Sequence, residues 1–179
     1  MSKRIQILTA EEMDRALERL AFEILEQHIQ SRELGLVGIQ RRGVQIAQRI
    51  KSILDERLGN HIPLGKLDIN LYRDDWTHLG NQPSINSTEI PFSIDSRELI
   101  LLDDVLFTGR TVRAALEAIL DFGRPRRVEL LVLVDRGHRE LPIHPDFVGK
   151  KINTSRNEQV DVLVKELDGE DGVILQGKH

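Results

Sequence analysis

Apolar residues recur along the chain at two alternating spacings, which predict helices and strands in turn. The first helical stripe begins after Thr9, which forms the signature of a capping box together with Glu12. The second stripe stops at Gly59 and the third at Gly123, and glycine commonly follows the end of a helix. The stripes cover Met13–His28, Val44–Leu58 and Thr111–Phe122.

Short apolar runs between these stripes predict strands at Leu34–Ile39, 66–72, Leu99–Leu102, Val128–Val134, 160–167 and 173–175. Strands that alternate with helices indicate an α/β fold, with a mostly parallel sheet flanked by helices. Ligands bind such sheets beyond the carboxyl ends of the strands. The chemistry is therefore expected in the loops after Ile39, Tyr72, Leu102 and Val134.

The length, cysteine content and net charge of the chain exclude several classes of protein. The 179 residues match one domain, expected over 1–179, and the absence of cysteine excludes disulfides, thiolate metal sites and a cysteine nucleophile. A net charge of −4 argues against broad binding to nucleic acid or anionic membranes but allows a local basic patch. Neither a signal-like start nor a membrane-spanning apolar run is present, which predicts a cytoplasmic protein without a membrane partner.

The segment after Leu102 places Asp103 and Asp104 ahead of a turn rich in small and hydroxyl-bearing residues, Thr108-Gly109-Arg110-Thr111. Backbone N–H groups of such a turn, at the start of a helix, bind phosphate well. The two carboxylates would repel that phosphate, but they suit the hydroxyl groups or the Mg²⁺ of the same ligand. A ribose 5-phosphate has this layout. The alternative is an ordinary strand–helix turn with two solvated aspartates.

The segment Leu99–Thr111 resembles the signature of the type I phosphoribosyltransferases, which bind 5-phosphoribosyl diphosphate. Other nucleotide motifs are missing from the sequence, since it has neither a Gly-x-Gly-x-x-Gly fingerprint nor a Walker A loop. Four further segments resemble one subfamily, whose members are both regulators of the pyrimidine operon and uracil phosphoribosyltransferases. These segments are Gly38–Gly43, Asp68–Asp75, Leu133–Pro142 and Val148–Ser155.

The resemblance implies the type I phosphoribosyltransferase fold and the transfer of ribose 5-phosphate to uracil, giving UMP and diphosphate. It implies that Asp103 and Asp104 are catalytic and hold the ribose hydroxyls, directly or through Mg²⁺-bound water. Arg73, also catalytic, would bind the leaving diphosphate from a mobile flap over about 73–89. The implied substrate-binding residues are Gln40, Arg41, Arg42, Gly43, Val105, Leu106, Phe107, Thr108, Gly109, Arg110, Thr111, Val134, Asp135 and Arg139.

One of these assignments also has a physical reason in the sequence. Arg41 and Arg42 precede a helix, where cations oppose the helix dipole, so a bound diphosphate would explain them better than a surface pair does. The resemblance implies that the loop after Val134 lies over the base, where Arg139 and backbone groups would pair with uracil.

Subfamily likeness also implies that the UMP-bound protein binds a leader-RNA hairpin and promotes transcription termination. The candidate contacts are Arg15, Arg19, Arg136, His138, Lys150, Lys151 and Thr154. The RNA-binding pattern has Thr, His and Arg where this chain has Glu18, Phe22 and His144. A phosphoribosyltransferase without RNA binding, or one for another nucleobase, therefore stays open. The resemblance further implies a homodimer or a higher homo-oligomer.

Overall fold

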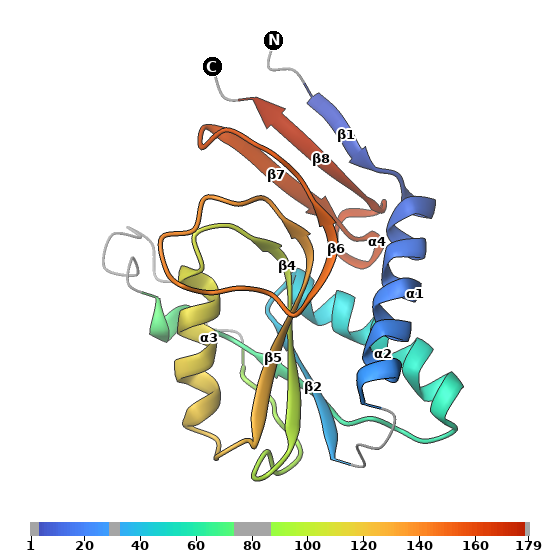
Figure 1. Cartoon of the computed structure of the whole chain (residues 1–179), viewed down its shortest axis with the longest axis vertical. Coiled ribbons are helices and arrows are strands. Elements are labelled where there is room, and N and C mark those ends of the chain that lie inside the picture. Colours follow the sequence, from blue (N-terminus) through green and yellow to red (C-terminus); the bar gives the residue numbers. More distant parts are fainter. Residues whose placement is uncertain (1–3, 29–32, 74–86, 178–179) are drawn as a thin grey trace.

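The computed structural model describes residues 4–28, 33–73 and 87–177. Five strands form a parallel sheet in the order β3-β2-β4-β5-β6, which we call the large sheet. Three more strands form the antiparallel small sheet, β1-β8-β7 (Figure 1). The elements are β1 (Arg4–Leu8), α1 (Ala10–Gln27), β2 (Leu34–Ile39), α2 (Arg42–Leu58), β3 (Leu64–Leu67), the 3₁₀ helix η1 (Asn70–Tyr72), β4 (Glu98–Leu106), α3 (Arg110–Leu120), β5 (Arg127–Asp135), β6 (Phe147–Lys151), β7 (Glu158–Leu163), α4 (Lys165–Asp168) and β8 (Gly172–Gly177).

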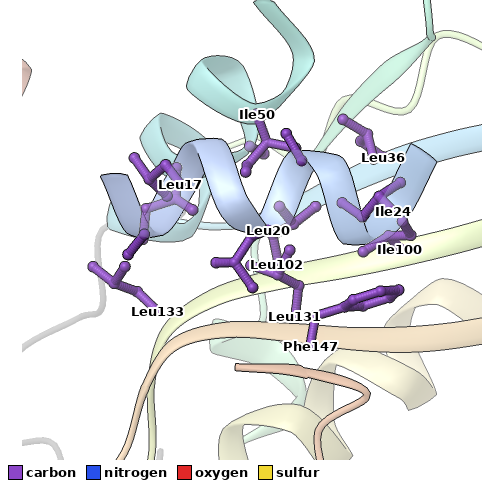
Figure 2. Close-up of a cluster of buried hydrophobic side chains, with 14 of the residues drawn as sticks. Leu17, Leu20, Ile24, Leu36, Ile50, Ile100, Leu102, Leu131, Leu133 and Phe147 are labelled. Atoms are coloured by element: carbon purple, nitrogen blue, oxygen red, sulfur yellow. The ribbon is translucent and has the colours of Figure 1, made fainter. Parts of the chain in front are cut away.

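Helices cover both faces of the large sheet, with α1 and α2 on one face and α3 on the other (Figure 1). In Figure 2, Leu17, Leu20 and Ile24 of α1 point towards the strands, where Leu131 and Phe147 meet them. Because both faces are covered, all six residues of β2 are buried, which explains its uninterrupted apolar sequence. The predicted α/β architecture is confirmed.

Local sequence signals set several element boundaries as predicted. Thr9 and Glu12 form both bonds of the capping box at the start of α1. Gly59 ends α2 in the left-handed conformation, with φ of 64°. The observed bounds of β2 and α3 also lie close to the ranges that periodicity predicts.

Other predicted boundaries are wrong. The strand predicted at 66–72 ends at Leu67, because the Asp68 side chain accepts the N–H of Asn70 (2.9 Å) and turns the chain into η1. β4 continues four residues beyond Leu102, so the acidic pair belongs to the strand and not to a loop. The strand predicted at 160–167 stops at Leu163, and the periodicity missed β1 and β6 altogether.

A buried histidine joins α1 to the large sheet at the end opposite the carboxyl ends of the strands. His28 Nδ1 lies 3.0 Å from a Glu98 oxygen and its Nε2 lies 2.7 Å from a Glu129 oxygen. The side chains of His28 and Glu129 are only 4% and 2% exposed. The Nδ1 contact has the geometry of a hydrogen bond, whereas the Nε2 contact is a close approach without that geometry. His28 therefore links the end of α1 to the first residues of β4 and β5.

We expect His28→Ala to lower the free energy of unfolding by about 3–5 kcal/mol, because it leaves a void and removes one partner of the buried Glu129, whose contact with Arg127 (2.6 Å) remains. Urea unfolding followed by circular dichroism measures the change. The matched control is His61→Ala, since His61 also contacts a carboxylate (Asp55, 3.1 Å) but its side chain is 92% exposed. Equal losses in the two variants would contradict this account of the His28 contact.

Candidate active site

A cavity of about 390 Å³ lies at the carboxyl ends of β2, β3 and β4. Three of the four loops that the sequence singles out meet there, although they are far apart in the chain. The lining residues are Ile39, Gln40, Arg41, Arg42, Asp68, Ile69, Asn70, Arg73, Asp103, Asp104, Val105 and Thr111. The topology of the large sheet therefore brings both predicted carboxylates and three predicted arginines to one site.

The acidic pair lies near the end of β4, in the wall of this cavity. Asp103 is 6% exposed, and one of its carboxylate oxygens accepts the N–H of Asp104 (2.9 Å). Burial, reinforced by the neighbouring charge of Asp104, raises the pKa of Asp103 well above its usual range. A bound cation or hydroxyl donors would favour the ionised form, so this carboxyl is suited to a ligand that brings them.

The chain turns at the end of β4, and we call Leu106–Gly109 the 106–109 turn. Three successive carbonyls of this turn accept hydrogen bonds from residues 135–141. The bonds join Arg136 N–H to Leu106 (3.1 Å), Arg139 Nη1 to Phe107 (3.0 Å), and the N–H groups of Glu140 and Leu141 to Thr108 (2.9 and 3.2 Å).

The N–H groups of the same three peptides belong to Phe107, Thr108 and Gly109. In a trans peptide the N–H points away from the carbonyl, so these groups face away from the 135–141 segment. Within the described ranges none of the three has an acceptor. Gly109 adopts a φ of 92°, which favours glycine, and immediately precedes α3. The turn therefore has the geometry of an anion-binding nest at the start of a helix.

The predicted diphosphate loop follows β2, and its two arginines differ. Arg41 is exposed and forms no ion pair with any described residue. Arg42 donates two bonds to Asp168 of α4 (3.2 and 2.7 Å), and this contact raises the pKa of its guanidinium. Arg41 is thus the cation available to a diphosphate, whereas Arg42 joins the cavity to the small sheet.

Several predicted substrate-binding residues do not line the cavity. Val134 is buried in β5, and Asp135 forms an ion pair with Arg139 (2.7 Å). The remaining donors of Arg139 reach the carbonyls of Phe107 and Ile143. This loop consequently packs behind the 106–109 turn. Gly43, Arg110 and the 106–109 turn also lie outside the lining. Gly43 packs on β4, and Arg110 pairs with Glu140.

Sequence reasoning missed two polar residues of the cavity, Asp68 and Asn70. The only signal for them was their place in the Asp68–Asp75 segment that carries the family resemblance. Of the expected flap over 73–89, Arg73 lines the cavity and Glu89 bridges Lys66 of β3. Residues 74–86 lie outside the described residues.

The candidate RNA contacts fall into two groups. Arg19 donates to the carbonyls of Val148 and Gly149 (3.1 and 2.6 Å), which holds α1 beside β6. Four candidates lie on these two elements, namely Arg15, Arg19, Lys150 and Lys151, and we call them the α1–β6 basic surface. The other three hold the 136–138 and 154–155 segments together: Arg136 donates to the Ser155 carbonyl, Thr154 donates to the Arg136 carbonyl, and His138 contacts the Thr154 carbonyl.

Comparison with known proteins identifies the family. Residues 4–166 match the family model of the phosphoribosyl transferase domain. A hypoxanthine phosphoribosyltransferase from Staphylococcus aureus shares the fold, with a TM-score of 0.71 at 21% identity over 97% of this chain and 92% of that one. The Trypanosoma cruzi enzyme gives 0.73 at 15% identity, over 97% and 91%. The chain belongs to the phosphoribosyltransferase family, as its sequence predicts.

Similarity of sequence places the chain more narrowly. It is 53% identical to the bifunctional protein PyrR of Thermus aquaticus, over 100% of this chain and 99% of that protein. It is 51% identical to the bifunctional protein PyrR of Syntrophobacter fumaroxidans, over 95% and 91%. These relatives are the bifunctional PyrR proteins. Among the described residues, no helix is long and apolar enough to cross a membrane.

Proposed function

We propose that the protein transfers ribose 5-phosphate from 5-phosphoribosyl diphosphate to N1 of uracil, giving UMP and diphosphate. One observation carries the proposal. Three backbone N–H groups, on Phe107, Thr108 and Gly109, have no acceptor among the described residues and adjoin the carboxylates of Asp103 and Asp104 in the same stretch of chain. A phosphate on the N–H groups would place ribose hydroxyls near the carboxylates.

The chemistry of the transfer matches the charges in the cavity. Breaking the bond between the anomeric carbon and the diphosphate develops positive charge on the ribose and negative charge on the leaving group. Asp103 and Asp104 face the ribose in this arrangement, while Arg41 and Arg73 face the diphosphate. Charged groups already placed where charge develops stabilise the transition state more than the bound substrate.

A magnesium ion fits the donors present. Among the described residues no three acidic or histidine side chains form a cluster that could hold a metal by themselves. Mg²⁺ is usually bound by one or two carboxylates together with substrate phosphates and water, which suits Asp103 and Asp104. When bound with the donor, it would neutralise charge on the departing diphosphate.

The base has a compartment next to the first cavity. A second cavity of about 170 Å³ shares Arg42 and Asp104 with the first and extends beneath the small sheet. Val160 and Val162 supply apolar walls. One N–H of the Gln176 amide donates to Asp161 (2.7 Å), which leaves its second N–H and its carbonyl oxygen for a ligand. Uracil needs an acceptor for N3–H and donors for two carbonyls, so we place it here and not against Arg139.

Conversion of uracil to UMP with 5-phosphoribosyl diphosphate and Mg²⁺, followed by chromatography, tests the activity. Hypoxanthine and guanine serve as competing acceptors, because solved structures of similar fold include a hypoxanthine and a hypoxanthine-guanine phosphoribosyltransferase. We expect UMP from uracil and no purine nucleotide. Preferential use of a purine would replace the proposed substrate, and no transfer to any base would overturn the enzyme assignment.

We also assign a regulatory function, consistent with the bifunctional relatives: the UMP-bound protein, in the cytoplasm, binds pyrimidine-operon leader RNA and promotes transcription termination. The α1–β6 basic surface supports this, because Arg15 and Lys151 are exposed there. Glu18 and Phe22 also lie on the exposed side of α1, and Arg57 stacks over the Phe22 ring (4.9 Å).

In a gel-shift titration with leader RNA, UMP is expected to tighten binding, and Arg15→Ala with Lys151→Ala is expected to weaken it. Each lost phosphate contact should also reduce the slope of log affinity against log salt by about 0.7–0.9. Arg124→Ala with Arg126→Ala removes the same charge at the opposite end of the large sheet and is the control. Binding that does not respond to UMP would contradict the regulatory function.

A further inference from the structure

Arg136 is a buried cation that no carboxylate neutralises among the described residues. The residue is 6% exposed. One terminal nitrogen donates to the Ser155 carbonyl (2.9 Å), and the Nε has no hydrogen-bond partner in the described ranges. Because a buried charge without a counter-ion is costly, this arrangement requires a compensating group.

Part of the compensation comes from Phe107. The guanidinium carbon of Arg136 lies 3.9 Å from the centroid of the Phe107 ring, within the range of a cation–π contact. The Arg136 N–H also donates to the Leu106 carbonyl (3.1 Å). Side chain and backbone of Arg136 therefore both hold the 106–109 turn, on the side opposite its free N–H groups.

Burial disfavours the charged form and lowers the pKa of Arg136, while the charge of Glu158 opposes this shift. The charged guanidinium is thus under-compensated in the described structure. An anion on the other side of the 106–109 turn would complete the compensation. The N–H groups of Phe107, Thr108 and Gly109 mark where such an anion binds.

We propose that Arg136 is a positioning residue for the 5-phosphate: it stacks on Phe107, holds the three N–H groups in place and adds positive potential behind them. This inference rests on the proposed function, since it takes the anion to be the phosphate of UMP or of the donor. It also gives Arg136 a role distinct from RNA contact.

The test compares binding of UMP with binding of uridine, which lacks the phosphate, by isothermal titration calorimetry. We expect Arg136→Met to weaken UMP binding about 10- to 100-fold, a range typical of coupling between groups that do not touch the ligand, and to leave uridine binding unchanged. Arg136→Lys keeps the charge but not the planar stack, so its affinity for UMP should lie between those of the unmodified protein and Arg136→Met. The matched control is Arg57→Met, because Arg57 also covers a phenylalanine ring, Phe22, away from the site.

If Arg136 were merely structural, Arg136→Met would weaken the binding of UMP and of uridine equally. An unchanged ratio of UMP affinity to uridine affinity in this variant therefore overturns the proposal. If Arg136→Met does not fold, the ratio in Arg136→Lys decides: a several-fold fall supports the proposal, and an unchanged ratio overturns it. Failure of the unmodified protein to bind UMP is a different result, which would instead count against the proposed function.

Discussion

Replacing both Asp103 and Asp104 by asparagine is expected to lower kcat/KM for UMP formation by at least about 10³-fold, since removal of a single preorganised electrostatic group already costs about 10²–10³. In the proposed function, the two carboxylates lie beside the ribose, where positive charge develops. Asparagine keeps the size of each side chain but removes the charge. Initial rates at saturating and limiting donor concentrations separate kcat from KM.

The control removes the same amount of charge elsewhere: Glu23→Gln with Glu117→Gln, two exposed glutamates on α1 and α3. We expect this control to retain the rate of the unmodified protein. A double asparagine variant with an intact rate would show that the acidic pair is not catalytic and would remove the basis of the assignment.

The raised pKa of Asp103 also makes the free energy of unfolding depend on pH. Because its pKa in the folded chain is raised, its stabilising effect is complete below the ordinary value of 3.8 and is lost as the pH rises through the raised value. Asp103→Asn should therefore be more stable than the unmodified, ligand-free protein near pH 8, and the two should converge near pH 3. Urea midpoints across this range measure the difference, and a destabilised variant near pH 8 would contradict the burial argument.

Gly43→Ala is expected to reduce kcat/KM by about 10²-fold, the cost of displacing site groups by about 1 Å. A Cβ at Gly43 would lie 2.5 Å from the Leu102 carbonyl oxygen and 3.2 Å from the Cα of Asp103. Both neighbours are backbone atoms of β4, so the start of α2 must move away. Overpacking of this kind also costs about 1–3 kcal/mol of stability.

Steady-state kinetics with the donor varied measures the first effect, and urea unfolding measures the second. The control is Gly177→Ala in β8, where a Cβ would meet no atom within 4 Å. If Gly43→Ala and Gly177→Ala both behave like the unmodified protein, close approach of α2 to β4 is not what places the diphosphate loop.

The features that could be predicted from the sequence are those that depend on residues close together in the chain. The capping box at Thr9 and Glu12 determines the start of α1 through atoms three residues apart. The continuous apolar run of β2 predicts a strand covered on both faces. Asp103 and Asp104, followed by the 106–109 turn, predict the chemistry of the site, because one short segment contains both the carboxylates and the N–H groups.

The sequence left open which groups are free to bind a ligand. Arg41 and Arg42 are adjacent and chemically identical, yet α4 neutralises only Arg42, through an aspartate 126 residues away. Arg139 has the donors that a base requires, but the fold uses them on Asp135, Phe107 and Ile143. Competition between a ligand and distant parts of the same chain is decided by tertiary contacts, which periodicity does not record.

The sequence by itself therefore determined the α/β class, the strand ends at which the cavity lies and the phosphoribosyltransferase signature, since each depends on residues close together in the chain. Only the tertiary structure decided that Asp68 joins the cavity, that the small sheet adds a second compartment, and that Arg136 lies behind the 106–109 turn. The physical reason is that burial and pairing of a charged side chain depend on which distant elements pack against it, and packing is a property of the whole fold.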